Sequence, residues 1–268
     1  MLSNSPIGVF DSGVGGLTVV KALMERLPHE NIIYFGDTAR VPYGIKSVEI
    51  IQNFATQMTQ FLLNQHVKML VIACNTVAAV AAEHVTKIAG TLPVLNVIES
   101  GANAAVARTR HQSIGVVATL ATVNSGAYEV AIEERLQSCS VYTQACPLFV
   151  PLVEEGLLDH AATWHIAKDY LQFTRTESID TLLLGCTHYP LLTPLLTKLI
   201  GRSIYIVDPA KTVADEVASV LQTSQLLNQD TILPTYQFYV SDIPLRFQTI
   251  AERFLGCALP NLEVVRLD

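Results

Sequence analysis

The chain has 268 residues, of which half are hydrophobic and 15% are charged. This length allows one large domain or two domains of ordinary size, and the apolar content excludes a disordered chain. The net charge of −7 and the pI near 5.5 argue against a nucleic acid or an anionic membrane as partner, because both require clustered Lys and Arg.

Neither a targeting segment nor a metal site is expected. Residues 1–8 contain no basic region and no long apolar run, and the most apolar stretch, 69–82, is too short to cross a bilayer. We therefore expect a soluble, cytoplasmic protein without a membrane partner. The cysteines show no CxxC motif and no paired Cys/His spacing, so free thiols are expected. The five are Cys74, Cys139, Cys146, Cys186 and Cys257.

An apolar strand at 7–10 opens the pattern and leads through Asp11-Ser12-Gly13-Val14-Gly15-Gly16 into a helix. The glycines match a dinucleotide-binding fingerprint poorly, because Thr18 occupies the third glycine position. We expect them instead to let backbone N–H groups approach a small anion at the helix N-terminus. Asp11 is placed to point into the cleft, and capping of the turn is its alternative role.

Strands and helices continue to alternate. The Gly- and Pro-rich loop 36–44 follows a strand, which is a common place for binding residues. The further elements expected up to residue 113 are strands at 31–35 and 94–98, a helix capped by Ser47, a strand ending before Cys74, a helix at 76–89 and a helix opening at Glu99.

The pattern restarts at Ile114. Residues 114–119 repeat residues 7–12 with an offset of 107 residues. Cys186 repeats Cys74 with an offset of 112 residues, and Asp208 repeats Glu99 with an offset of 109 residues. The second copy is expected to contain a helix at 125–136, a strand at 141–145, a loop with Glu154, a strand ending before Cys186, a helix to Ile200, a strand at 204–207 and a helix from Asp208. A strand at 236–240, a helix at 245–255 and a strand at 262–267 follow.

This alternation predicts an α/β fold with two pseudo-symmetric domains, each a mostly parallel sheet flanked by helices. The first domain, with Cys74, would cover 1–98. The second, with Cys186, would cover 99–207. The segment 208–268 has no third repeat to join and is expected to return to the first domain.

The two equivalent cysteines are the main chemical signal. Each ends a strand, where parallel sheets bind ligands, and each precedes a helix N-terminus whose partial positive charge favours a thiolate. A lone cysteine there is more often a small buried hydrophobe. A facing pair, however, suits removal of a proton from one face of a carbon and delivery to the other. A nucleophilic Cys186 with His188 as base, a redox pair and a non-catalytic amino-acid-binding protein are the alternatives.

The chain resembles the bacterial glutamate racemases in its motifs. These are Asp11-Ser12-Gly13-Val14-Gly15-Gly16-Leu17-Thr18-Val19, Gly36-Asp37-Thr38, Pro42-Tyr43-Gly44, Ala73-Cys74-Asn75-Thr76 and Gly185-Cys186-Thr187-His188-Tyr189-Pro190. The resemblance implies an aspartate/glutamate racemase-like fold with the site between two domains. It also implies interconversion of L- and D-glutamate without a cofactor, to supply D-glutamate for peptidoglycan. A racemase for aspartate or another amino acid is the alternative.

The resemblance further implies residue roles. Cys74 and Cys186 match the paired catalytic cysteines, and we expect Asp11 and His188 to assist them. Capping is the alternative role for Thr119, and a solvated carboxylate is the alternative for Glu154. The expected substrate contacts are Asp11, Ser12, Pro42, Tyr43, Gly44, Asn75, Thr76, Thr119, Thr122, Glu154, Thr187 and His188. Glutamate is the expected small-molecule partner, no metal is expected, and a homodimer is a family expectation.

Overall fold

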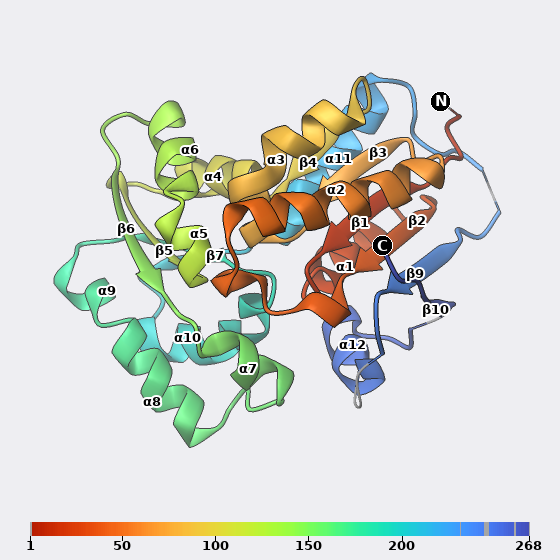
Figure 1. Cartoon of the computed structure of the whole chain (residues 1–268). Coiled ribbons are helices and arrows are strands. Elements are labelled where there is room, and N and C mark those ends of the chain that lie inside the picture. The colour runs from red at the N-terminus through yellow and green to blue at the C-terminus, as the bar shows by residue number, and fades with distance from the viewer. Residues whose placement is uncertain (1, 231, 244–246, 260, 268) are drawn as a thin grey trace.

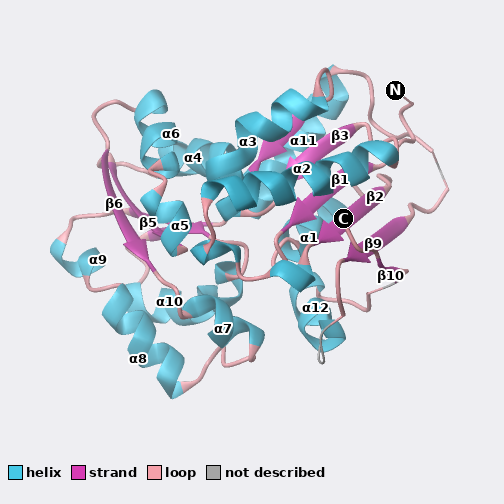
Figure 2. Ribbon diagram, viewed as in Figure 1, coloured by secondary structure: helices cyan, strands magenta, loops and turns pink. Residues whose placement is uncertain are grey.

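A computed structural model of the chain describes residues 2–230, 232–243, 247–259 and 261–267. Two β-sheets lie apart from each other, with helices packed around and between them (Figures 1 and 2). We call them the first sheet and the second sheet. Every described strand pair in both sheets is parallel. The predicted α/β class with parallel sheets is confirmed.

The first sheet has the strand order β10-β9-β2-β1-β3-β4, and the second has the order β6-β5-β7-β8. The order β2-β1-β3-β4 is thus the same as β6-β5-β7-β8, as an internal duplication requires. The strands are β1 (Ile7–Asp11), β2 (Ile32–Gly36), β3 (Met69–Ile72), β4 (Val94–Asn96), β5 (Ser113–Ala118), β6 (Ser140–Ala145), β7 (Thr181–Gly185), β8 (Tyr205–Val207), β9 (Tyr236–Val240) and β10 (Leu262–Val264).

Helices cover the sheets, because the parallel crossovers place them there. In the first half α2 packs along α3, and α1 packs on α11 and α12; in the second half α4 packs on α6 and α8 packs on α10. The helices are α1 (Leu17–Arg26), α2 (Val48–Asn64), α3 (Asn75–Ala89), α4 (Val97–Arg108), α5 (Leu120–Asn124), α6 (Ala127–Arg135), α7 (Phe149–Glu154), α8 (Ala161–Tyr170), α9 (Phe173–Thr176), α10 (Thr193–Ile200), α11 (Pro209–Thr223) and α12 (Phe247–Leu255). Three 3-10 turns are η1 (Thr38–Arg40), η2 (Tyr43–Ile45) and η3 (Tyr189–Leu192).

The core strands form where the sequence has short apolar runs. All residues of β1, β3 and β7 are buried, which is typical of central strands covered on both faces. β1 lies between β2 and β3, and β5 lies between β6 and β7. The site residues that follow β1, β3 and β7 therefore leave the centre of each sheet at the carboxyl ends of strands.

Several boundaries differ from the sequence prediction. The helix expected at 125–136 is α6, which begins at Ala127 because Gly126 before it adopts a left-handed conformation with φ of 67°; the short helix α5 that precedes it was not predicted. The helix expected to open at Glu99 begins at Val97, because Asn96 caps it. β10 ends at Val264, earlier than predicted. Positions 245 and 246 of the predicted last helix lie outside the described residues.

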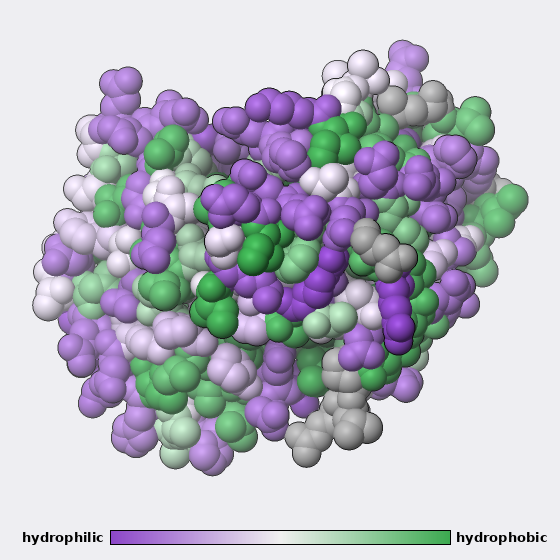
Figure 3. Space-filling model, viewed as in Figure 1, coloured by the Kyte–Doolittle hydropathy of each residue, from purple (hydrophilic) through white to green (hydrophobic). Residues whose placement is uncertain are grey.

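Polar residues dominate the face shown in Figure 3, with apolar residues scattered between them. Among the described residues, none of the helices combines the length and the apolar character that crossing a bilayer requires.

Candidate active site

The two cysteines follow equivalent strands. Cys74 comes two residues after β3 and is the N-cap of α3, and Cys186 comes directly after β7. Their exposed fractions are 5% and 6%. Asp11 is the last residue of β1, the strand paired with β3, and it is 1% exposed. Both thiols are therefore held on rigid strand ends, out of bulk water.

Cys74 has Ser12 and Asp11 around it. The Cys74 thiol donates to Ser12 Oγ over 3.4 Å. Asp11 Oδ1 accepts from the backbone N–H of Gly13 at 2.9 Å, whereas Asp11 Oδ2 is buried without a hydrogen-bond partner among the described residues. The glycine turn thus binds the carboxylate of Asp11 itself, in contrast to the free anion that the sequence analysis predicted. The open oxygen is suited to hold a proton or an ammonium group.

Burial controls protonation on this side. It raises the pKa of the Cys74 thiol to about 12, with the nearby Asp11 carboxylate adding to the effect. Burial also raises the pKa of Asp11, against the opposing effect of His188. Burial and the Asp11 charge thus act against the thiolate that the sequence analysis expected the α3 N-terminus to favour at Cys74.

Cys186 has a different set of partners. Its Sγ lies 3.9 Å from His188 Nδ1, and His188 Nε2 lies 2.9 Å from Glu154 Oε1. Burial lowers the pKa of His188, but the hydrogen bonds to Cys186 and Glu154 dominate and raise it to about 10. His188 is therefore an imidazolium at neutral pH, with a positive charge beside the sulfur.

The predicted helix N-terminus after Cys186 is absent in its expected form. The chain makes the 3-10 turn η3 first, and α10 begins only at Thr193. The positive charge beside this thiol thus comes from His188, because a single 3-10 turn has few aligned peptide dipoles.

Residues from the two repeats meet at the site. Thr76, Thr119 and Thr122 form a triangle of hydroxyl groups, with Oγ1 separations of 3.0 to 3.5 Å. Thr119 is also the N-cap of α5, so its hydroxyl accepts the Thr122 N–H. The Tyr128 hydroxyl donates to Asn75 Oδ1 at 2.6 Å, which leaves the amide NH₂ of Asn75 as a donor.

Gly15 lies where the first repeat touches the second. A Cβ at this position would be 2.2 Å from Thr187 Oγ1 and 2.5 Å from His188 Nδ1. The Thr18 hydroxyl donates a hydrogen bond of 3.2 Å to the Thr187 carbonyl oxygen. The glycine-rich turn therefore holds the loop after β7 by close backbone approach.

The loop that contains Pro42, Tyr43 and Gly44 is held by Asp37. This buried carboxylate accepts from the Tyr43 hydroxyl, from Arg40 Nε at 2.6 Å and from Ser241 Oγ at 2.7 Å. Pro42 is exposed, and the Tyr43 side chain is buried with its hydroxyl on Asp37. Gly44 approaches Thr119, with 3.4 Å between its Cβ position and Thr119 Cβ. The Tyr43 hydroxyl is thus bound within the protein, and a substrate contact of Tyr43 stays a prediction.

Sequence reasoning missed two residues that shape the site, Asp37 and Tyr128. Asp37 stands in the quoted Gly36-Asp37-Thr38 motif, which was the available signal. Tyr128 lies 53 positions from Asn75, and nothing in its local sequence marks it. Glu154 was considered as a substrate contact or a solvated carboxylate; the structure brings it to His188.

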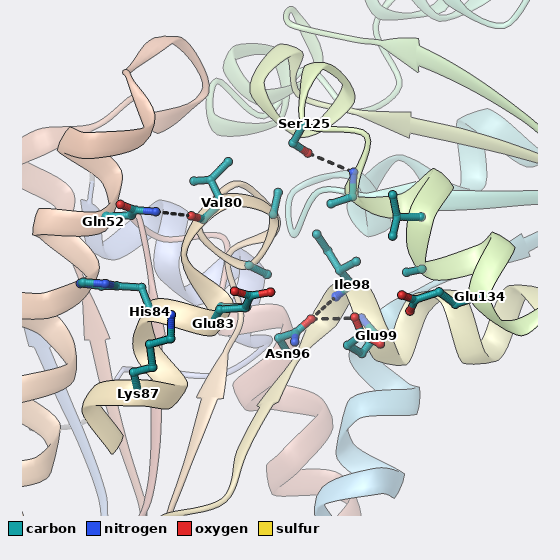
Figure 4. A pocket seen from close by; sticks show the side chains of 16 residues that line it. Gln52, Val80, Glu83, His84, Lys87, Asn96, Ile98, Glu99, Ser125 and Glu134 are labelled. Atoms are coloured by element: carbon teal, nitrogen blue, oxygen red, sulfur yellow. Dashed lines mark hydrogen bonds between the residues drawn. The ribbon is translucent and has the colours of Figure 1, made fainter. Parts of the chain in front are cut away.

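Two hollows differ in their relation to the cysteines. A narrow cavity of about 10 Å³ is lined by residues of both repeats, including Asn75, Cys186 and Thr187. A wider groove of about 660 Å³ lies between α3 and the α4–α6 region (Figure 4). Its charged lining, such as Glu83, comes from positions outside the predicted site. No group of three or more His, Cys, Asp or Glu in the described part could hold a metal ion.

The comparisons with known proteins identify the family. The model of the Asp/Glu/Hydantoin racemase family matches residues 14–217. The chain belongs to this racemase family. It is 58% identical over 262 residues to the glutamate racemase of Syntrophus aciditrophicus and 56% identical to that of Neisseria meningitidis serogroup A, covering 98% of this chain and 97% of each relative. The crystal structure of the Francisella tularensis glutamate racemase in complex with D-glutamate superimposes with a TM-score of 0.95 at 44% identity, covering 100% of this chain and 99% of that one.

These matches confirm three predictions from the sequence: the resemblance to bacterial glutamate racemases, the racemase fold, and the assignment of the chain as an enzyme of this family. Within that racemase fold, Cys74 lies near Asp11 in the first repeat, and Cys186 lies beside His188 in the second.

Proposed function

We propose that this racemase-family chain interconverts L- and D-glutamate, using Cys74 and Cys186 as two acid/base groups on opposite faces of the α-carbon. The observation that carries the proposal is the matched placement of the two thiols after β3 and β7, which occupy the same position in their sheets. The relatives named glutamate racemase and the related structure with bound D-glutamate support glutamate as substrate.

The proton balance is simple. The thiolate of one cysteine takes the α-proton, so a C–H bond breaks and an S–H bond forms. The thiol of the other cysteine gives its proton to the opposite face, so an S–H bond breaks and a C–H bond forms. The carbon inverts, and the two cysteines exchange protonation states. The reverse direction uses the same groups with their roles exchanged.

The negative charge that develops on the α-carboxylate needs hydrogen-bond donors. In this proposal the NH₂ group of Asn75 and the hydroxyls of Ser12, Thr76 and Thr187 donate to it. Burial of Asn75, Thr76 and Thr187 keeps water away, which strengthens each interaction. The open oxygen of Asp11 receives the substrate ammonium or a proton from Cys74.

The protonation pattern favours an unequal pair. Cys74, with a pKa of about 12, is a thiol at neutral pH, and it is the proton donor in the resting enzyme. The imidazolium of His188 faces Cys186 and stabilises negative charge on that sulfur. One acid and one base on opposite sides is the arrangement that proton transfer across a carbon requires.

The duplication weighs against the alternative of a nucleophilic Cys186 with His188 as general base. A protonated His188 beside Cys186 is compatible with either role of that thiol, so it is the matched position of Cys74 that weighs against a lone nucleophile. That mechanism also gives Cys74 no role.

Incubation of L-glutamate in heavy water tests the reaction directly. We expect optical rotation to fall to zero while deuterium enters the α-position. Cys74→Ser and Cys186→Ser should each lower racemisation by several orders of magnitude. Glutamate that keeps its rotation and its α-proton would refute the racemase proposal, and full racemisation by either variant would refute the two-cysteine mechanism. Aspartate in a parallel reaction measures substrate specificity.

In the cell, the proposed product is D-glutamate for peptidoglycan, made in the cytoplasm. Depletion of the protein in its host should cause lysis that added D-glutamate prevents. A homodimer stays a prediction, which the mass in solution tests.

A further inference from the structure

The last described helix, α12, reaches from the first sheet to the second. It packs on α1, and a Cβ at Gly256, just beyond it, would be 3.0 Å from Lys21 Nζ of that helix. From this support Arg253 reaches the end of α7. Arg253 Nη1 donates to the carbonyl oxygens of Val153 at 3.0 Å and Glu154 at 3.2 Å.

The turn after α7 packs closely against the Arg253 guanidinium. The final carbonyls of a helix lack partners within the helix, and Arg253 supplies a charged donor there. Gly156 follows with φ of 77°, and a Cβ on it would be 2.7 Å from Arg253 Nη2. Only a residue without a side chain allows both the left-handed turn and the close approach.

Phe254, the next residue on α12, contacts His188, which is the hydrogen-bond partner of the Glu154 side chain. The Phe254 ring lies 5.0 Å from the His188 ring in an edge-to-face arrangement, with its side chain buried. Arg253 thus holds the backbone of Glu154, and Phe254 holds the ring of His188. These are the two partners of the 2.9 Å hydrogen bond beside Cys186.

We propose that Arg253 is a positioning residue for the Cys186 side of the reaction: by fixing the end of α7 it holds the Glu154 carboxylate on His188. Glu154 needs such support because its side chain is 40% exposed, and an exposed carboxylate has many competing rotamers and water contacts. The inference rests on the proposed racemase function.

Arg253→Met tests this role, because it keeps the apolar stem and removes the donors. We expect kcat to fall about 10- to 100-fold, the range that a displacement of about 1 Å produces. KM should change little. The high-pH limb of the kcat/KM profile should move to lower pH, because a displaced Glu154 no longer raises the pKa of His188. Cys186, Glu154 and Asp11 are the titratable groups that act on His188. Gln248→Ala, which removes a surface hydrogen bond on the same helix, is the control.

A double-mutant cycle with Glu154→Gln separates positioning from stability. If Arg253 acts through Glu154, Arg253→Met should cost little further activity in the Glu154→Gln background. If the two substitutions lower kcat independently, so that their fold losses multiply in the double variant, the proposal is wrong. A wild-type pH profile in Arg253→Met would also overturn it. If that variant fails to fold, Arg253→Lys replaces it in the same cycle, and the same criteria apply. Wild-type enzyme that does not racemise glutamate would instead refute the proposed function.

Discussion

At the scale of single residues, the two cysteines hold equivalent positions but have unlike partners. Cys74 lies near a carboxylate, Asp11, whose charge opposes a thiolate. Cys186 lies beside His188, which is held protonated by Glu154. The proposed reaction, which is nearly symmetric for its substrate, would thus use thiols whose neighbours carry opposite charges. The pH dependence should reveal this difference.

Activity should depend on the charge of His188. The imidazolium form predominates below its pKa of about 10 and is lost as the pH rises through that value, so racemisation should fall there. Glu154→Gln removes the negative charge that helps to raise this pKa, so the falling limb should move to lower pH. Profiles of kcat/KM between about pH 6 and 11 measure how far this high-pH limb moves between the wild type and the variant. An unchanged limb in Glu154→Gln would contradict the assignment.

Tyr128→Phe should weaken both stability and substrate binding. It leaves Asn75 Oδ1 buried without its donor, which costs about 1–3 kcal/mol in the free energy of unfolding. The freed amide of Asn75 can rotate, so KM for glutamate should rise. Denaturant unfolding and initial-rate kinetics measure the two effects. Tyr170→Phe, which alters a half-buried tyrosine hydroxyl in the second repeat, is the control and should leave KM unchanged.

At the scale of elements, the site depends on how two strand-end loops pack against each other. The turn between β1 and α1 contacts the loop between β7 and η3, and Gly15 is the point of closest approach. The hydrogen bond from Thr18 to the Thr187 carbonyl continues that contact along the first turn of α1. The two loops come from different repeats, so any bulk between them separates the two cysteines.

Gly15→Ala should therefore reduce racemisation strongly, by about 100-fold or more, because its methyl group would displace Thr187 and His188. Gly44→Ala is a useful comparison, since its methyl would meet Thr119 at an ordinary contact distance of 3.4 Å. Activity assays measure the loss of racemisation in each variant, and crystal structures show whether Thr187 and His188 are displaced. Equal activity in the two would show that the Gly15 contact is unimportant.

At the scale of the whole molecule, a buried ion pair stabilises the fold near the start of β3. Lys68 Nζ lies 2.5 Å from Glu30 Oε2, and the two side chains are 0% and 2% exposed. Lys68 also donates to the carbonyl oxygens of Ser3 and, at 2.8 Å, of Leu226, and Glu30 accepts from the Asn228 N–H at 2.7 Å. Chain segments far apart in sequence are joined here.

Lys68→Met should destabilise the protein by about 3–5 kcal/mol, because it leaves the Glu30 charge buried without compensation. The double variant Lys68→Met with Glu30→Gln should recover part of this loss. Because Lys68 precedes β3 and Cys74 follows it, kcat at a permissive temperature should stay near the wild-type value. Urea unfolding and kinetics together test this; a large drop in kcat with unchanged stability would contradict it.

Much of the fold could be predicted because its signals are local. Apolar runs such as β3 and β7 and the glycine turn after Asp11 are each visible within about ten residues, and the repeat of Cys74 at Cys186 is visible when two such short stretches are compared. They indicated parallel sheets and two thiols at equivalent strand ends. Local signals failed for short one-turn elements, such as α5 and the 3-10 turn after Cys186.

The sequence by itself determined the two strand-helix repeats and the pair of cysteines, since hydrophobic periodicity and chain direction decide which residues stand at strand ends. Only the tertiary structure decided which groups act on those cysteines. Glu154 and His188 are 34 positions apart, Asn75 and Tyr128 are 53 apart, and Val153 and Arg253 are 100 apart. Such contacts depend on how two sheets and the returning C-terminal helix pack, and burial in that packing then set the protonation of each thiol's partners.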